Sequence, residues 1–262
     1  MGAGLLALAL SFALPAFQVV LHAALADNLT WYFELNEASG NAIDSVAAAN
    51  LTDTNTVTSA AGKVGNARDY TAANSEYFTG ADSAARSTGD IDFTLAGWAW
   101  FDSAATAMDF LSKWETGQQE FLLRRAGVDV IQFYVSADGS ATTNVDSAVA
   151  ISTGTWYFIA ARHDSTNNLI RLRVDTTDAT AVSHAGGVFD SSTALLFGAI
   201  LPATPTNFLD GRMDEWGFWK RHLSDAELTT LYDSGTGMSY SDITGGAVSC
   251  KGSLLLLGAG GC

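Results

Sequence analysis

Charged side chains are scarce in this chain, and basic ones are scarcer than acidic ones. Only 16% of the 262 residues are charged, and 13 Lys and Arg stand against 28 Asp and Glu, which gives a net charge of −15. The first basic side chain in the sequence is Lys63. An acidic surface repels a phosphate backbone, so the composition excludes nucleic acid as an expected partner.

The motifs of several common active sites are missing as well. The sequence contains no Gly-rich phosphate loop, no CxxC pair and no HExxH, which are the patterns that hold nucleotide phosphates and zinc. EF-hand spacing is also missing, although acidic loops leave calcium binding open. The apolar run that begins at Leu5 is interrupted by Pro15, Gln18 and His22, so it is too short for a bilayer. We therefore expect no transmembrane span.

The pattern that is present is that of β-strands. Apolar side chains alternate with polar ones at residues 131–136 and 170–174, which gives each predicted strand one dry and one wet face. At 93–100 both faces are apolar, and such a strand belongs in the middle of a sandwich. The Asp138-Gly139 dipeptide is typical of a hairpin turn. With 48% apolar residues, one large β domain can bury a full core.

The most informative stretch is residues 208–235, which predicts a buried strand followed directly by a short helix. Trp216 lies in the apolar strand, where we expect it to pack in the core. Ser224 precedes Glu227 by three residues, which is the capping-box pattern at a helix N-terminus. Gly235 stands where a helix stop is expected. We therefore assign structural roles to Trp216, Ser224 and Glu227.

Five blocks of sequence follow one another in a characteristic order. They are WYFELNEASGNAIDS (31–45), AGKVGNARDYTAANSEYFTG (61–80), DFTLAGWAWFD (92–102), GTWYFIAARHD (154–164) and FLDGRMDEWGFWKRHLSDAELTTLYDSG (208–235). Together they resemble the laminin-G-like, concanavalin A-like jelly rolls. The resemblance implies an all-β fold, a two-sheet antiparallel jelly-roll sandwich with one short C-terminal helix. We assign this domain to residues 27–240, between residues 1–26 and a Gly- and Leu-rich tail at 241–262.

An enzymatic role is not expected. Glycoside hydrolases of the jelly-roll class need two carboxylates that flank one bond. The nearest acidic strand carries Asp214 and Glu215, which are adjacent and are therefore expected to point to opposite faces of the sheet. None of the four histidines stands near a Ser or Cys nucleophile motif. The sequence thus predicts a non-catalytic module.

Asp214 and Glu215 then need a structural role, because one of them must face inward on an otherwise apolar strand. The resemblance implies that this inward acid ties the closing strand to the opening loop, sometimes through calcium, with Asp44 as a second ligand. The residues alone leave an alternative open, in which backbone N–H groups or an arginine, Arg68 or Arg212, hold the carboxylate. Calcium, at Asp44 and Asp214, is thus the one cofactor that the sequence leaves open.

Binding of a glycan or surface polysaccharide is the activity that the resemblance implies. Sugar recognition uses an exposed aromatic platform and planar polar groups that meet hydroxyls. The candidate ligand-binding residues are Trp114, Tyr134, His163, Asp164 and Asn167. Trp114 is the preferred platform, since it stands between a lysine and a glutamate near a glycine-containing turn. The alternative for each residue is ordinary packing or solvent exposure.

The two ends of the chain allow two functional interpretations. Residues 1–26 contain no Lys, Arg, Asp or Glu and end in an A-x-A sequence, which fits either a cleaved signal peptide or a retained assembly arm. The first interpretation is an extracellular or surface-displayed carbohydrate-binding module used in adhesion. The second is a structural or decoration subunit, as in a phage virion, that associates with itself or with other subunits through residues 1–26 and 250–262. Cys250 and Cys262 could bridge to each other or between subunits, or remain free.

Overall fold

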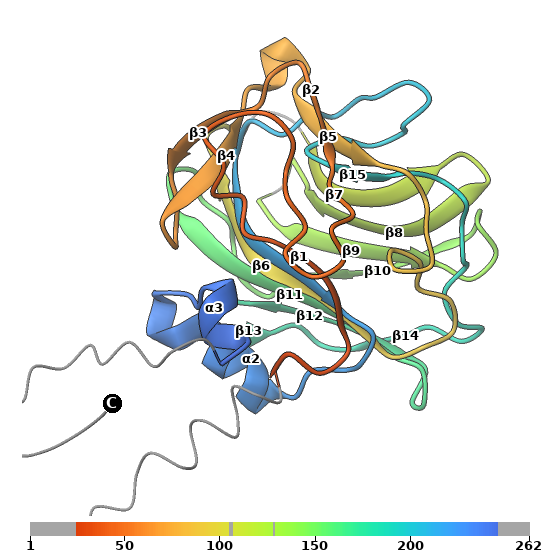
Figure 1. The fold of residues 1–262 in the computed structure, drawn as a ribbon. Helices are drawn as coiled ribbons and strands as arrows, with labels where there is room; N and C mark the ends of the chain where they lie inside the picture. The colour runs from red at the N-terminus through yellow and green to blue at the C-terminus, as the bar shows by residue number, and fades with distance from the viewer. Residues whose placement is uncertain (1–24, 105–106, 128, 246–262) are drawn as a thin grey trace, which may run out of the picture.

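Two antiparallel β-sheets packed face to face form the body of the protein (Figure 1). This computed structural model describes residues 25–104, 107–127 and 129–245. Within that part of the chain, the larger sheet consists of β1 (Leu29–Phe33), β3 (Thr58–Ala61), β4 (Asn66–Tyr70), β6 (Phe93–Phe101), β11 (Trp156–Asp164), β12 (Leu169–Val174), β13 (Thr177–Asp178), β14 (Val182–Ser183) and β16 (Gly211–Trp219). The smaller sheet consists of β2 (Thr52–Thr54), β5 (Tyr77–Gly80), β7 (Met108–Glu115), β8 (Gln118–Arg125), β9 (Ile131–Ser136), β10 (Thr142–Asp146) and β15 (Leu195–Phe197). The predicted all-β, two-sheet antiparallel sandwich is confirmed.

The strand order explains why some segments are apolar on both faces. The larger sheet runs β13-β12-β11-β6-β16-β4-β3, with β1 paired to β16 and β14 paired to β12, while the smaller runs β10-β9-β8-β7-β15-β5-β2. β6 therefore lies in the middle of the larger sheet. Phe93, Leu95 and Phe101 on this strand belong to the core between the sheets, whereas Ala96 and Trp98 belong to a second cluster on the outer face. Both faces of β6 are thus buried, as the sequence predicts for a central strand.

Aromatic rings from distant strands fill the space between the sheets. The ring of Trp31 on β1 lies 5.4 Å from that of Phe33 and 5.8 Å from that of Phe197 on β15, so it joins the two sheets. Trp216 is fully buried and donates from Nε1 to the carbonyl of Trp98 at 2.8 Å. Gly97 makes room for it, because a Cβ there would lie 2.4 Å from the indole ring. Such rings supply large buried areas and hold the sheets in register.

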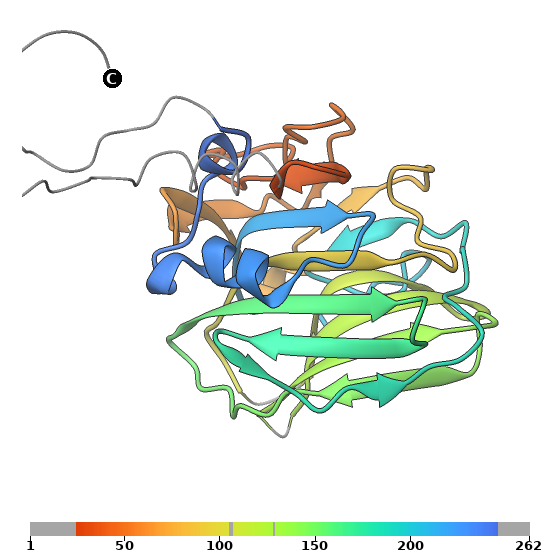
Figure 2. The same ribbon diagram turned by 90° about the horizontal axis from the view of Figure 1, so that it is seen from below.

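The helices lie against the outer face of the larger sheet (Figures 1 and 2). The predicted C-terminal helix is α2 (Asp225–Tyr232), which η2 (Asp233–Gly235) and the four-residue α3 (Tyr240–Ile243) follow; η1 (Ala72–Asn74) is a separate 3-10 turn. Ser224 caps α2 by accepting the N–H of Glu227, and the Glu227 carboxylate accepts the N–H of Ser224 at 2.8 Å. The cap fixes the angle at which the chain leaves β16.

A second apolar cluster lies between these helices and the sheet. Leu228 and Ile243 pack there with Trp98 and Trp219, all buried. The indole of Trp219 donates to the carbonyl of Leu25 at 2.6 Å. The first and last described segments of the chain therefore meet on the outer face of the larger sheet. Residues 1–24 and 246–262, with both cysteines, lie outside the described residues.

A β-bulge in β16 overturns the expectation that Asp214 and Glu215 point to opposite faces. Asp214 pairs with Trp98 and Gly217 with Ala96, so one extra residue is accommodated between them. Glu215 takes up the bulge with a φ of 51°, a left-handed conformation that a non-glycine residue adopts at some cost. Since Trp98 and Ala96 face outward, Asp214 lies on the outer face, and Glu215 lines a cavity beside Trp98 on that same face.

Candidate functional site

Asp214 and Glu215 form a buried acidic pair. Asp214 is fully buried and Glu215 is 3% exposed. Oδ2 of Asp214 accepts the backbone N–H groups of Lys63 at 2.6 Å and Val64 at 2.8 Å, which is the backbone alternative from the sequence. Burial raises the pKa of Asp214 to about 7 and, with the charge of Asp214 adding to it, the pKa of Glu215 to about 9.

The space beside this pair is too small for a ligand. The cavity lined by Glu215, Tyr32, Trp98 and Trp219 offers about 10 Å³ to the centre of a water molecule, which is close to the minimum for one water. Asp214 joins β16 to the loop around Lys63. It does so from the outer face and not, as the resemblance implies, by reaching inward to the opening loop.

The calcium hypothesis does not fit the donors around Asp44. Its Oδ1 accepts the N–H groups of Tyr32 at 3.1 Å and Val46 at 3.0 Å, and its Oδ2 accepts that of Ala49 at 3.4 Å. An oxygen that already faces N–H protons is not arranged to hold a cation. Within residues 25–245 as described, no group of three or more His, Cys, Asp or Glu side chains could hold a metal ion.

Neither candidate arginine is the partner of Asp214. Arg68 is fully buried and donates to the carbonyl groups of Gly40 at 2.9 Å and Val57 at 2.5 Å. Arg212 pairs with Asp69 at 3.3 Å. The closing strand is therefore tied to its neighbours by the backbone donors to Asp214 and by the Arg212–Asp69 pair, while Arg68 holds separate loop carbonyl groups.

The outer face of the smaller sheet carries a connected set of polar side chains, which we call the polar face: Arg124, Gln132, Tyr134, Asn144 and Asp146. The hydroxyl of Tyr134 donates to Oε1 of Gln132 at 3.1 Å. Nε2 of Gln132 donates to Oδ1 of Asp146 at 3.0 Å, and Nδ2 of Asn144 donates to the same oxygen at 2.7 Å. Because β8, β9 and β10 hold these groups in cross-strand register, the polar face is positioned by rigid strands.

An arginine is fixed at one end of the polar face. Arg124 donates from Nε and Nη2 to the two oxygens of Asp109, at 2.8 and 3.1 Å, and Asn207 donates to Oδ2 at 2.7 Å. Burial raises the pKa of Asp109, although Arg124 and Asn207 act against that shift. The guanidinium lies 6.0 Å from the centre of the Tyr134 ring. A planar cation and an aromatic ring are thereby held side by side.

Trp114 does not present the exposed platform that the sequence suggests. Its exposed fraction is 8%, and it packs with Leu122 and Ile200. Its ring meets that of Tyr134 edge to face, with the centroids 6.2 Å apart. The structure therefore brings Trp114 and Tyr134 together, but Tyr134 is the more exposed of the two, and Trp114 supports it from the side.

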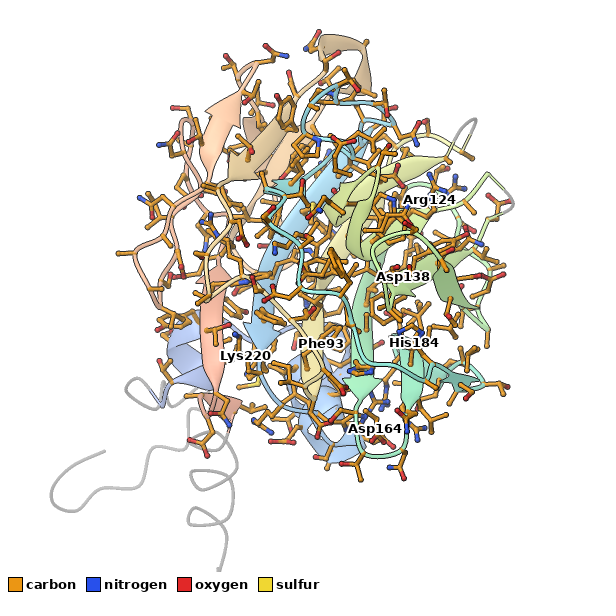
Figure 3. All side chains as sticks on the ribbon, turned by 90° about the vertical axis from the view of Figure 1, so that its right-hand side faces the viewer. Phe93, Arg124, Asp138, Asp164, His184 and Lys220 are labelled. Atoms are coloured by element: carbon orange, nitrogen blue, oxygen red, sulfur yellow. The ribbon has the colours of Figure 1, made fainter. Side chains whose placement is uncertain are left out.

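The other three candidate ligand-binding residues lie elsewhere. His163 is fully buried, its Nδ1 lies 2.7 Å from the carbonyl oxygen of Ile91, and its ring packs 5.5 Å from that of Phe93. It is a core residue and cannot meet a ligand from solvent. Asp164 and Asn167 form a closed turn between β11 and β12, in which Asp164 accepts both the N–H and the side-chain amide of Asn167, at 2.9 and 2.8 Å. Figure 3 shows Asp164 far from Arg124.

Sequence reasoning missed a pair of half-buried tryptophans on the larger sheet. Trp100 on β6 and Trp156 on β11 are opposite each other in the ladder, with ring centroids 5.9 Å apart. The guanidinium of Arg212 lies 5.3 Å from the centre of the Trp100 ring. The alternation in β6 places Trp100 on the face of Trp98, yet the ring of Tyr232 on α2 stacks against Trp98 at 5.7 Å and leaves Trp100 half-buried.

Sequence reasoning also missed a cleft on the outer face of the larger sheet. Arg162, Arg171, His222, Ser224 and Asp225 line it, and its volume is about 340 Å³. The local signal was the alternation of arginines along 170–174, which indicates a polar face. That His222 and the start of α2 lie over this face is a consequence of the tertiary fold.

The chain belongs to the concanavalin A-like lectin/glucanases superfamily, because residues 72–229, more than half of the sequence, match the laminin G family of that description. The resemblance that the five blocks indicate is thereby confirmed. A search of curated proteins finds no match.

Solved structures with a similar fold include a toxin binding domain, one domain of an arabinanase and a neurotoxin. The binding domain of Paraclostridial Mosquitocidal Protein 1 has a TM-score of 0.67 at 14% identity, over 80% of this chain and 53% of that one. Domain 4 of AbnA, a GH43 extracellular arabinanase from Geobacillus stearothermophilus in complex with arabinotriose, has a TM-score of 0.61 at 17% identity, over 78% and 97%. Botulinum neurotoxin type C, whose cell entry depends on two ganglioside molecules, has a TM-score of 0.61 at 8% identity, over 81% and 52%. The chain thus spans about half the length of the two toxin chains, and the likeness to all three is one of fold.

Proposed function

We propose that the protein is a non-catalytic carbohydrate-binding module and that the polar face is its glycan site. The observation that carries this proposal is the hydrogen-bonded row of Tyr134, Gln132 and Asp146, beside the fixed guanidinium of Arg124. An aromatic ring flanked by planar donors and acceptors is the chemistry that sugar rings and hydroxyls require. The arabinotriose complex of the similar AbnA domain supports a glycan as the ligand class.

The buried acids support the absence of catalysis. Glycoside hydrolysis needs two carboxyl groups on either side of an accessible bond, about 5–10 Å apart. The β-bulge puts Asp214 and Glu215 on one face of the sheet, so their direction does not by itself exclude a shared substrate. What counts against catalysis is access, because both carboxyl groups are buried and the adjoining cavity has room for about one water.

The geometry of the sandwich suits display outside the cell or on a particle surface. The described segments next to residues 1–24 and 246–262 meet around Trp219, on the side of the sandwich opposite the polar face. A module attached there would present the polar face away from its anchor, which supports the assembly alternative as well as adhesion. Among the described residues, no helix is long and apolar enough to cross a membrane.

The test is a glycan and polysaccharide panel with the full chain, followed by single substitutions. We expect Tyr134→Ala to weaken binding of the preferred glycan at least tenfold, and Gln132→Ala to weaken it less. Trp156→Ala is the matched control, since it removes a half-buried aromatic ring from the other sheet. Loss of binding with Trp156→Ala and not with Tyr134→Ala would move the site to the Trp100–Trp156 pair. A folded protein that binds no glycan would contradict the proposal and favour the assembly role.

A further inference from the structure

Three arginines gather on the outer face of the larger sheet in a chain that has only 13 basic residues. Arg162 on β11 and Arg171 on β12 are directly opposite in the ladder, and Arg173 lies two residues further along the same face of β12. Like charges opposite each other across a ladder destabilise a sheet. This placement therefore needs negative charge nearby.

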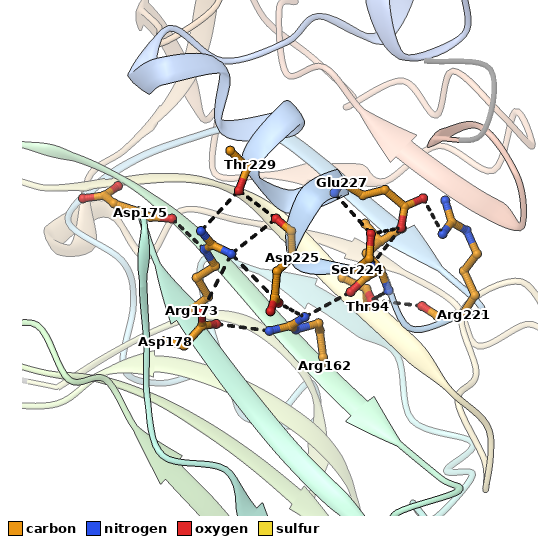
Figure 4. Close-up of polar contacts among 11 residues, drawn as sticks. Thr94, Arg162, Arg173, Asp175, Asp178, Arg221, Ser224, Asp225, Glu227 and Thr229 are labelled. Carbon is orange, nitrogen blue, oxygen red and sulfur yellow. Dashed lines mark hydrogen bonds and ion pairs between the residues drawn. The ribbon is translucent and has the colours of Figure 1, made fainter. Parts of the chain in front are cut away.

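Carboxylates within the protein satisfy two of the three arginines (Figure 4). Arg162 pairs with Asp225 at 2.7 Å and Asp178 at 3.1 Å, and donates to the carbonyl of Leu223 at 3.1 Å. Arg173 lies 3.8 Å from Asp178 and 4.0 Å from Asp225. Both guanidinium groups are almost completely buried under the start of α2, so they form part of the packing of that helix.

Arg171 is the arginine without a partner. Among the described residues it makes no ion pair, and its Nε is buried without a hydrogen-bond partner. Nε2 of His222, which lines the same cleft, is likewise buried and unpartnered. Asp164 is near enough for the charges of His222 and Arg171 to affect its pKa, but its oxygens are engaged by Asn167.

Two buried side-chain nitrogen atoms without hydrogen-bond partners, Nε of Arg171 and Nε2 of His222, therefore belong to residues that line one cleft. A buried polar group left without a partner is unfavourable, and a site for a ligand is one reason for a protein to retain it. The cleft of about 340 Å³ is within the range of small-molecule sites and exceeds what one oxyanion needs.

We propose that this cleft binds an acidic sugar, whose carboxylate is held by Arg171 and Nε2 of His222. The guanidinium of Arg171 supplies the charge and the planar donors that a carboxylate accepts. His222 supplies one donor from the tautomer with its proton on Nε2. Asp225 meets Arg162 through Oδ1, which leaves Oδ2 to accept a sugar hydroxyl. This site lies on the opposite side of the sandwich from the polar face and does not depend on it.

Calorimetric titration of the full chain tests the site with D-glucuronic acid and N-acetylneuraminic acid as probes, glucose as the neutral control and sulfate as the bare oxyanion. We expect an acidic sugar to bind at least tenfold more tightly than glucose and than sulfate. If glucose bound as tightly as the acidic sugars, the carboxylate of the sugar would have no role in binding. Equal binding of sulfate would overturn the role of the sugar, and no binding of either acid would overturn the site.

Substitutions and NMR locate the binding. We expect Arg171→Gln and His222→Phe each to weaken binding of the acidic sugar at least tenfold, while Lys220→Gln, which also removes one positive charge, leaves it unchanged. The imidazole signals of His222 should shift on titration and those of the distant His184 should not. Tyr134→Ala should leave binding of the acidic sugar intact. The glycan site on the polar face and the acidic-sugar site in the cleft can therefore be disproved separately. An unchanged affinity in Arg171→Gln would refute the assignment.

Discussion

Around Trp98 and Trp219, helices α2 and α3 and the first described residues cover the outer face of the larger sheet, whereas the outer face of the smaller sheet carries Gln132, Tyr134 and Asn144, which bond to their polar neighbours. Both sheets contribute to the same core. The difference arises because β6 has large apolar side chains on both of its faces and Trp219 of β16 adds another on the outer face, while β9 alternates buried apolar side chains with half-buried polar ones.

The two outer faces of the one sandwich are thus suited to different roles. On the covered face, polar groups are desolvated, so an acid such as Glu215 keeps its proton and a cap such as Ser224 adds stability. On the open face, a side chain contacts solvent or a ligand, so its removal leaves no buried cavity. Substitutions on the covered face should thus change the free energy of unfolding, and those on the open face should change binding.

A change in pH should alter the stability of the protein most, because it ionises the two buried acids. Both pKa values are raised in the folded state, to about 7 for Asp214 and about 9 for Glu215. The folded protein therefore holds these protons more tightly than the unfolded chain, whose carboxyl groups have pKa values near 4. The stability that this difference contributes is complete below about pH 4 and is lost as pH rises to about 9. The wild-type protein should lose on the order of 5 kcal/mol of unfolding free energy between about pH 5 and pH 9.

Glu215→Gln sharpens this prediction, because an amide cannot ionise. The variant should lose less than half as much stability over the same pH range, as measured by urea unfolding at several pH values. Glu115→Gln, a solvent-accessible glutamate at the end of β7, serves as the control and should follow the wild-type curve. Parallel curves for Glu215→Gln and wild type would show that Glu215 is ionised in the folded protein.

Next in size is the removal of a ring from the covered face. Trp219→Ala removes a buried indole and its hydrogen bond to Leu25, and we expect it to cost about 3–5 kcal/mol. Tyr134→Ala, on the open face, should cost less than about 1 kcal/mol. Chemical denaturation measures the free energy of unfolding of both variants. A similar loss of stability at the two positions would contradict the difference between the covered and the open face.

Loss of the helix cap should have a smaller effect. Ser224→Ala leaves the N–H of Glu227 without its acceptor, which should cost about 1 kcal/mol in thermal or urea unfolding. Thr230→Ala, on the exposed side of the same helix, should stay within about 0.5 kcal/mol of wild type. A Ser224→Ala variant as stable as wild type would mean that tertiary packing alone holds α2 in place.

The smallest change in stability is expected at Arg171. Arg171→Gln removes one member of a like-charged pair and no ion pair within the described structure, so the free protein should be as stable as wild type or more stable by up to about 0.5 kcal/mol. Its ladder partner provides the contrast, since Arg162→Gln leaves Asp178 and Asp225 without their main partner and should destabilise the protein. A marked loss of stability in Arg171→Gln would assign that residue a structural role.

Much of the fold could be predicted because its signals are local. The alternation at 131–136 and 170–174 corresponds to β9 and β12, and the Ser224–Glu227 spacing marks the start of α2. The bulge at Glu215 could not be predicted, since no glycine marks it and its register depends on β6. The expectation that neighbouring acids take opposite faces was wrong for that reason.

The candidate site was less predictable than the fold. Trp114 and Tyr134 do lie together, but the segment around Ile200 packs over Trp114 and leaves Tyr134 as the more open ring. His163 continues the inward row of Ile159 and Ala161 on β11 and is buried beside Phe93. The exposure of a side chain depends on which distant loop packs over it, and the local sequence pattern does not indicate that.

The acidic character of the protein, most of its strands, the start of α2 and its superfamily can be read from the order of its residues, because composition, alternation and capping act within a few residues. The packing of distant segments is what covers one outer face, puts Asp214 and Glu215 on the same face, and brings Arg171 and His222 to one cleft. These features depend on residues that lie far apart in the chain, and packing alone brings them together.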